Sequence, residues 1–135
     1  IDFSPVLPQT GAAAMEQFKR TYALHNQYGI DYHPGFNLGE RHLTNINALM
    51  LDKDDEGMRD RADQLFRSLV ADSASQGYGE YRSHITYMDL IAETFNYNNQ
   101  GLSQLNSAVK DALDPNGILS PGKSGIWPSS YRGDV

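Results

Sequence analysis

The sequence contains no cysteine among its 135 residues, which excludes disulfides, iron–sulfur ligation and thiol catalysis in this chain. The absence is typical of a reducing compartment, so the cytoplasm is the predicted location. No apolar run approaches the roughly 20 residues of a membrane-spanning helix, and no membrane partner is expected. Basic residues are few and dispersed. The 11 Lys and Arg against 17 Asp and Glu give a formal charge of −6, which argues against nucleic-acid binding.

Histidine is also scarce, with four residues and no pair at i, i+4 spacing, so no metal site is expected. The segment from Gly117 to Ser124 formally satisfies the G-x-x-x-x-G-K-S phosphate-loop pattern. That loop requires a preceding strand and a helix that begins at the Lys-Ser pair. Here a predicted helix precedes the pattern and Trp127-Pro128 follows it, so ATP or GTP binding is not expected.

The chain has enough apolar residues, 39%, for one globular core. Thr10 and Gly29 are suited to cap a helix whose apolar stripe comprises Met15, Phe18, Tyr22 and His25. Residues 30–33 and 36–38 alternate with period two around Pro34-Gly35, and residues 43–51 make a second strand-like run. Residues 2–6 suggest another strand. An acidic turn at 52–55 begins a second helix. This order predicts an α+β fold in which helices flank a mostly antiparallel sheet.

The character of the sequence changes at Gly77, where a domain boundary is predicted. A short strand carrying Tyr81-Arg82 is expected next, and then a helix over residues 83–94. The polar run Asn96–Asn99 breaks the pattern before a further helix marked by Leu102, Leu105, Val109 and Ala112. Residues 1–77 and 78–135 are therefore predicted to be separate parts.

The dipeptide Tyr81-Arg82 follows a glycine-flanked turn and places a phenol beside a guanidinium. Tyrosine donates one directional hydrogen bond, and arginine keeps its charge at any working pH. Together they are suited to stabilise an anionic oxygen. The alternative is structural: the tyrosine packs at a strand end, while the arginine meets solvent or a carboxylate.

Four ordered segments, Phe3–Val6, Gly77–His84, Tyr87–Asp89 and Asp114–Pro128, together resemble the C-terminal part of the vanillyl-alcohol oxidase and 4-cresol dehydrogenase flavoprotein family. The resemblance spans nearly the whole chain and is closest to the eugenol-oxidase branch. It implies that residues 1–77 are the latter part of the antiparallel-sheet cap, or substrate, domain. Residues 78–135 would be the C-terminal return segment of the FAD-binding domain.

The resemblance implies an FAD that is covalently bound to a histidine. The family pattern His-x-x-Phe-Ser-Pro, laid on Phe3-Ser4-Pro5, places that histidine immediately upstream of Ile1. The chain is therefore expected to be the C-terminal piece of a longer polypeptide and inactive alone. A break at the flavin-modified residue is one hypothesis for the start at Ile1.

By the same resemblance, Tyr81 and Arg82 bind the phenolic oxygen of the substrate, and Arg82 and Lys123 lie near the flavin, where positive charge favours its reduced anion. The alternative for Lys123 is an exposed loop lysine. Asp2, Ser4, Asn37 and Ile46 would line the substrate pocket, although strand alternation alone also explains their positions. Thr44-Asn45 departs from the His-His of some fungal relatives, so their substrate range does not transfer to this chain.

The implied reaction transfers a hydride from the para side chain of a phenol, such as vanillyl alcohol, eugenol or a 4-alkylphenol, to flavin N5. A quinone methide results, and O2 reoxidises the flavin to give H2O2. The implied partners are the remainder of the polypeptide, a small phenol, O2 and further copies in a homodimer or higher homo-oligomer. Two alternatives stay open: a phenol dehydrogenase or hydroxylase that passes electrons to a cytochrome or cupredoxin, and a non-catalytic interaction domain.

Overall fold

The computed structural model describes residues 1–132, which form two compact units that divide between Arg82 and Ser83. The division lies five residues after the boundary predicted at residues 77 and 78. The division separates two regions that are each compact. The assignment of these parts to a cap domain and an FAD-binding domain stays a prediction.

A sheet of four short strands forms the centre of the first unit. The strands are β1 (Asp2–Phe3), β2 (Val6–Leu7), β3 (His33–Leu38) and β4 (Leu43–Ala48). All pairings are antiparallel: β4 pairs with β3 on one edge and with β1 and β2 on the other. Together with its helices this sheet confirms the predicted α+β class.

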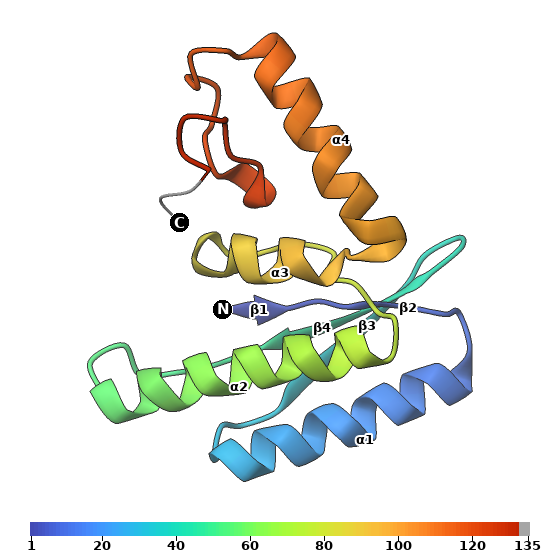
Figure 1. The fold of residues 1–135 in the computed structure, drawn as a ribbon. Coiled ribbons are helices and arrows are strands. Elements are labelled where there is room, and N and C mark those ends of the chain that lie inside the picture. The colour runs from blue at the N-terminus through green and yellow to red at the C-terminus, as the bar shows by residue number, and fades with distance from the viewer. Residues whose placement is uncertain (133–135) are drawn as a thin grey trace. The chain divides into compact units, whose positions relative to one another are not determined.

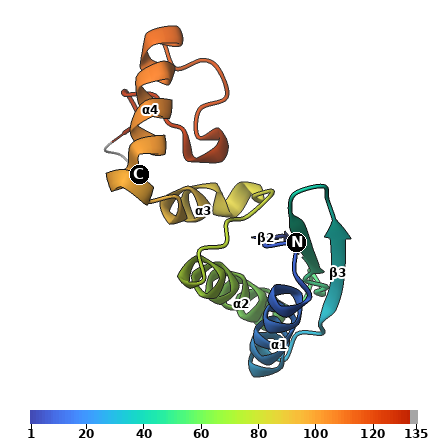
Figure 2. The same ribbon diagram turned by 90° about the vertical axis from the view of Figure 1, so that its right-hand side faces the viewer.

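Helices α1 (Gly11–Tyr28) and α2 (Glu56–Ser75) lie side by side on one face of this sheet (Figures 1 and 2). The predicted caps of α1 are confirmed: the Thr10 side chain accepts from the Ala13 N–H, and Gly29 ends the helix at a φ of 64°. Asp55 caps α2 by accepting from the Met58 N–H. These short-range signals fix where both helices begin, and the left-handed glycine fixes where α1 ends.

The buried stripe of α1 differs from the predicted one. Met15, Phe18 and Tyr22 are exposed, and of the expected stripe only His25 is buried. The inward face instead carries residues at i, i+4 spacing, namely Ala13, Gln17, Thr21 and His25. These buried polar groups find partners close by in the chain: Gln17 donates from Nε2 to Thr21 Oγ1 at 3.0 Å, and His25 Nδ1 lies 3.0 Å from the Asp31 carbonyl oxygen.

The hydrophobic core of the first unit lies between α2 and the first strands. Phe3 of β1 meets Phe66 of α2 edge to face, with ring centroids 5.9 Å apart. The inward face of α2 is an apolar stripe in which Ala62, Leu65, Phe66, Leu69 and Val70 are all buried. This packing anchors the strand that carries Phe3-Ser4-Pro5.

Strand β3 runs through Pro34-Gly35, the pair around which the sequence alternates. Pro34 lies opposite Asn47 and Gly35 lies opposite Ile46. A proline is tolerated here because, among residues 1–132, β3 pairs only with β4, and an edge strand leaves half of its N–H groups outside the ladder. The hairpin itself, with its turn closed by the Gly39 N–H and the His42 carbonyl, agrees with the sequence.

The second unit begins with a short 3-10 turn, η1 (Ile85–Tyr87), followed by α3 (Met88–Thr94), α4 (Tyr97–Leu113) and the 3-10 turn η2 (Lys123–Gly125). The helix expected over residues 83–94 is thus shorter than predicted. The polar break is a left-handed turn, with positive φ at Asn98, Asn99 and Gln100, which merges into α4. Asparagine adopts this conformation more readily than most residues, which explains its use here.

Helix α4 keeps its apolar residues exposed within its own unit. None of its residues is buried, and Leu102, Leu105, Val109 and Leu113 are all exposed. The helix is held at its end by Asp114, whose carboxylate pairs with Lys110 at 2.7 Å and accepts from the Ile118 and Leu119 N–H groups.

Among residues 1–132, no helix combines the length and the apolar character that crossing a bilayer requires.

Candidate active site

Three of the four residues predicted to line a pocket share one face of the sheet. Directly opposed residues in an antiparallel ladder point to the same side, and side chains alternate along each strand. Asp2 lies opposite Ala48, Asn37 lies opposite Thr44, and Ile46 is on β4 between those two. Because Phe3 and Asn47 face the helices, Asp2, Asn37 and Ile46 must point to the opposite face of the sheet.

Ser4, the fourth of these residues, lies at the break between β1 and β2 and is buried. Its carbonyl accepts a hydrogen bond from the Tyr81 N–H at 2.8 Å, and the Val6 N–H donates to the Gly79 carbonyl at 2.8 Å. These bonds flank an antiparallel bridge between Pro5 and Glu80. The structure therefore joins the segment next to the expected flavin attachment to the segment that carries Tyr81.

The expected short strand carrying Tyr81-Arg82 is reduced to this single bridge, and both residues lie in a bend after it. The Tyr81 side chain is 57% exposed, and the Arg82 guanidinium lies over its ring, 5.5 Å from the centroid. No carboxylate of residues 1–132 forms an ion pair with Arg82. A phenol and an unneutralised cation are thus presented together, an arrangement that can bind an anionic oxygen.

Glu80 is the residue of this site that the sequence reasoning missed. Its Oε1 accepts a hydrogen bond from the Ser4 N–H at 2.6 Å, while its Oε2 is buried and has no hydrogen-bond partner among residues 1–132. Burial, assisted by the nearby Asp2 carboxylate and opposed by the Ser4 hydrogen bond, raises the pKa of Glu80 to about 8. The available signal was its place directly before Tyr81-Arg82, in a segment expected to pair with a strand.

A layer of polar groups supports the sheet from the helix side. Asn45 donates from Nδ2 to the Gly35 carbonyl at 3.1 Å, and Asn47 donates from Nδ2 to Asn45 Oδ1 at 2.9 Å. The Tyr32 hydroxyl is buried beside Asn45 and Thr21, and burial raises the pKa of Tyr32 to about 12. These groups are neutral at any working pH, so they orient β3 and β4 without adding charge under the site.

Lys123 lies in the second unit, at the first position of η2, and its side chain is exposed. It forms no ion pair with a carboxylate of residues 1–132. Gly122 precedes it with a φ of 79°, and its N–H donates to the Ile126 carbonyl at 3.0 Å. The lysine is therefore held on a tight, closed turn, and its predicted place near the flavin stays a prediction.

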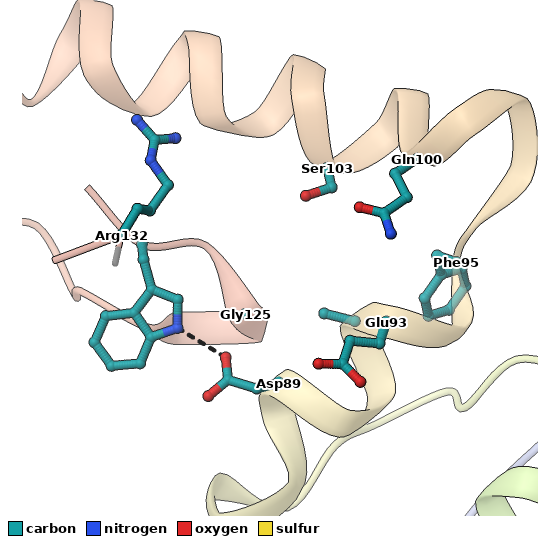
Figure 3. Close-up of a pocket in the computed structure, with 9 residues that line it drawn as sticks. Asp89, Glu93, Phe95, Gln100, Ser103, Gly125 and Arg132 are labelled. Carbon is teal, nitrogen blue, oxygen red and sulfur yellow. Dashed lines mark hydrogen bonds between the residues drawn. The ribbon is translucent and has the colours of Figure 1, made fainter. Parts of the chain in front are cut away.

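The second unit also contains a cavity of about 280 Å³ between α3, α4 and the loop after η2. In Figure 3, Gln100 and Ser103 point into it from α4, with Asp89 and Glu93 of α3 on the opposite side. Trp127 closes one wall by donating from Nε1 to Asp89 Oδ1 at 2.8 Å. None of the predicted site residues lines this cavity.

Comparison with known proteins identifies relatives along nearly the whole chain. The family described as FAD linked oxidases, C-terminal domain, matches residues 11–124. The 4-cresol dehydrogenase [hydroxylating] flavoprotein subunit of Pseudomonas putida is 30% identical over 124 residues, which cover 92% of this chain and 23% of that protein.

Two solved structures share the fold. The 4-ethylphenol oxidase of Gulosibacter chungangensis, in complex with isoeugenol, matches with a TM-score of 0.94 and 39% identity over 98% of this chain and 25% of that one. A p-cresol methylhydroxylase with substrate bound matches with a TM-score of 0.89 and 29% identity over 94% of this chain and 24% of that one.

The chain thus spans about a quarter of the length of these relatives. The predicted relationship to the 4-cresol dehydrogenase flavoproteins is confirmed, and so is the assignment to their C-terminal part. From the family match and these relatives, the chain belongs to the FAD-linked oxidases and corresponds to their C-terminal domain.

Proposed function

We propose that this chain is the C-terminal portion of an FAD-dependent enzyme that oxidises para-substituted phenols such as vanillyl alcohol, eugenol or 4-alkylphenols. The observation that carries the proposal is the exposed pair Tyr81 and Arg82, a phenol beside a guanidinium without a carboxylate partner among residues 1–132. The names of the relatives support the substrate class, since they act on 4-cresol and 4-ethylphenol.

Tyr81 donates a hydrogen bond to the phenolic oxygen of the substrate, and Arg82 supplies the positive charge that favours the phenolate. Asp2, Asn37 and Ile46, on the sheet face that α1 and α2 leave uncovered, line the pocket together with Ser4. An ionised phenol pushes electron density towards its para carbon. A hydride can then leave the side chain attached there, and the substrate becomes a quinone methide, which adds water or rearranges.

The residues present suit a flavin that becomes an anion on reduction. Arg82 and Lys123 are exposed cations without a carboxylate partner in the described part of the chain, so their charge is available to such an anion. FAD, covalently attached to the histidine expected immediately before Ile1, supplies the two-electron acceptor for the hydride. The histidine and the rest of the FAD site belong to the remainder of the polypeptide.

The electrons are proposed to pass to O2, which is reduced to H2O2. A dehydrogenase that uses a cytochrome or cupredoxin is the second candidate, favoured by the name of the Pseudomonas putida relative. Peroxide release in air during turnover of 4-ethylphenol distinguishes the two. The homo-oligomeric state and the cytoplasmic location stay predictions.

The proposal is tested in the complete FAD-containing polypeptide by mixing it anaerobically with 4-ethylphenol and following flavin absorbance. Tyr81→Phe and Arg82→Ala are each expected to slow flavin reduction by roughly 100-fold, because both remove stabilisation of developing negative charge. Tyr97→Phe is the control, since Tyr97 is 89% exposed and lies in the second unit. Reduction at the unaltered rate in both site variants would refute the role, and a complete protein without flavin absorbance would favour a non-catalytic interaction domain.

A further inference from the structure

The pairing between Ser4 and Tyr81 departs from a regular antiparallel ladder. Two residues that face each other as a hydrogen-bonded pair normally exchange both N–H···O=C bonds. The Tyr81 N–H does donate to the Ser4 carbonyl at 2.8 Å. The Ser4 N–H, however, donates to the side chain of Glu80, with 2.6 Å between Ser4 N and Glu80 Oε1. The carboxyl of Glu80 thus occupies the place that the Tyr81 carbonyl would take.

We propose that Glu80 is a positioning residue for the Tyr81-Arg82 pair: its carboxyl replaces the Tyr81 carbonyl as the acceptor for the Ser4 N–H and so ends the ladder at Tyr81. The chain then bends away, and both following side chains are exposed. A ladder continued by the backbone would hold Tyr81 and Arg82 in an extended strand along Ser4. The inference rests on the role proposed above for Tyr81 and Arg82.

The protonation state of Glu80 supports this role. Burial raises the pKa of Glu80 to about 8, so near neutral pH most of the population is the uncharged acid. An uncharged carboxyl accepts the Ser4 hydrogen bond without neutralising the neighbouring guanidinium. The described residues agree with this state, because Glu80 Oε1 accepts the hydrogen bond from the Ser4 N–H and Glu80 forms no ion pair with Arg82. The charge of Arg82 therefore remains available for a phenolate.

Variants of Glu80 separate the acceptor from the charge. Glu80→Gln keeps an oxygen at the same distance along the side chain and mimics the neutral acid, so flavin reduction is expected to stay within about twofold of the unaltered rate. Glu80→Asp is one methylene shorter and misplaces the acceptor, and Glu80→Ala removes it. Both are expected to slow reduction by roughly 10- to 100-fold, the effect of a small misplacement of groups at the reacting centre.

The experiment uses the complete FAD-containing polypeptide and 4-ethylphenol as the probe. Anaerobic stopped-flow absorbance gives the rate of flavin reduction, and an ultraviolet difference spectrum reports how much of the bound phenol is phenolate. Melting temperature and flavin content are measured on the same samples. Glu16→Ala, at an exposed glutamate of α1, is the matched control.

The inference is supported if Glu80→Gln behaves like the unaltered protein while Glu80→Asp binds less phenolate and reduces flavin slowly at normal flavin content. A role in stability alone would lower the melting temperature and leave the phenolate signal per folded molecule unchanged, which overturns the proposal. Equal defects in Glu80→Gln and Glu80→Ala also overturn it, because charge rather than the acceptor would then matter. If Glu80→Ala does not fold, the Gln and Asp variants still decide.

Failure of the proposed function has a different signature. If Tyr81→Phe and Arg82→Ala leave phenolate binding and flavin reduction unchanged, the function assigned to the pair is wrong whatever Glu80 does. If those two variants are impaired and Glu80→Asp and Glu80→Ala are not, the function stands and the positioning role of Glu80 is wrong.

Discussion

Nε1 of Trp127 donates a hydrogen bond to Oδ1 of Asp89 at 2.8 Å and so ties the loop after η2 to the first turn of α3. Asp89→Ala leaves the half-buried indole N–H without its acceptor and removes a negative charge from a helix N-terminus. Both effects lower stability, together by about 1–3 kcal/mol. Thermal unfolding of the complete polypeptide measures the loss. Glu93→Ala on the same helix is the control, and an equal loss in both variants would contradict the assigned bond.

Two glycines at positive φ, one in each unit, offer a graded test of packing. Gly77 and Gly122 have φ values of 77° and 79°, so alanine is strained at either position. A Cβ at Gly77 meets nothing within 4 Å, whereas one at Gly122 would lie 2.5 Å from Cζ2 of Trp127. Gly77→Ala is expected to cost about 1 kcal/mol and Gly122→Ala about 3 kcal/mol. Melting temperatures that fall equally in the two variants would show that the Trp127 contact is absent.

The raised pKa of Glu80 predicts a pH-dependent stability. The folded state holds the proton up to about pH 8, while the unfolded chain releases it near the ordinary value of 4.5. The stabilisation is therefore complete below about pH 4.5 and is lost as the pH rises through that window, by at most about 1.4 kcal/mol per pH unit. Glu80→Gln cannot ionise, so its stability relative to the unaltered protein should increase from pH 5 to pH 8.

Urea unfolding of both proteins at pH 5, 6.5 and 8 measures this difference. The charged and titratable groups beside Glu80 in its own unit are Asp2 of β1 and its chain neighbours Tyr81 and Arg82. Asp2→Asn removes a carboxylate that raises the folded-state pKa of Glu80 by repulsion, so the upper limit of the window should fall in that variant while the lower limit stays near pH 4.5. Parallel stability curves for the unaltered protein and Glu80→Gln would contradict a raised pKa.

The polar layer beneath the sheet predicts an unusual sensitivity at Asn45. Asn45→Ala removes the donor to the Gly35 carbonyl and the acceptor for Asn47 Nδ2, and it leaves a void at a fully buried position. A loss of about 2–4 kcal/mol is expected, because buried polar partners are left unpaired. Asn26→Ala, at an exposed position of α1, is the matched control and should leave the urea midpoint nearly unchanged. An equal effect of the two would place the stabilisation elsewhere.

Lys123 is tested through the reduction potential of the bound flavin. If its ammonium group lies near the flavin, Lys123→Met should destabilise the reduced anion and lower the reduction potential. A destabilisation of about 1.4 kcal/mol corresponds to a fall on the order of 30 mV for a two-electron couple. Dye equilibration in the complete polypeptide measures the shift, with Lys19→Met on α1 as the control. A potential unchanged in Lys123→Met would leave Lys123 as an exposed loop lysine.

The sequence predicted the elements with local signals better than the faces they bury. Thr10, Gly29 and Asp55 act within one turn of the chain, so the helix ends followed from the residues themselves. The buried stripe of α1 did not, because Gln17 and Thr21 are polar and bond to each other while buried, which a search for apolar periodicity does not detect. The exposed Phe18 and Tyr22 rings stack on each other instead, with centroids 6.1 Å apart.

The same reason limits what the sequence says about the site. Tyr81 and Arg82 could be identified because a phenol next to a guanidinium in the sequence indicates binding of an anionic oxygen. A family resemblance then gave them a role. The only signal for Glu80 was its place directly before this pair. Its importance comes from a hydrogen bond to Ser4, 76 residues away in the sequence. A side chain that replaces a backbone acceptor in a strand pairing leaves no pattern in the neighbouring sequence.

The strip formed by residues 2–7 pairs on both sides, with β4 along one edge and with residues 79–81 along the other. Its hydrogen bonds span 44 residues to Asn47 and 76 residues to Glu80. Closing such long loops loses chain entropy before the stabilising contacts can form, so these pairings should form late in folding. The Tyr81-Arg82 pair would reach the position proposed for it only when the first unit is otherwise complete, and partly folded chains would lack the proposed anion site.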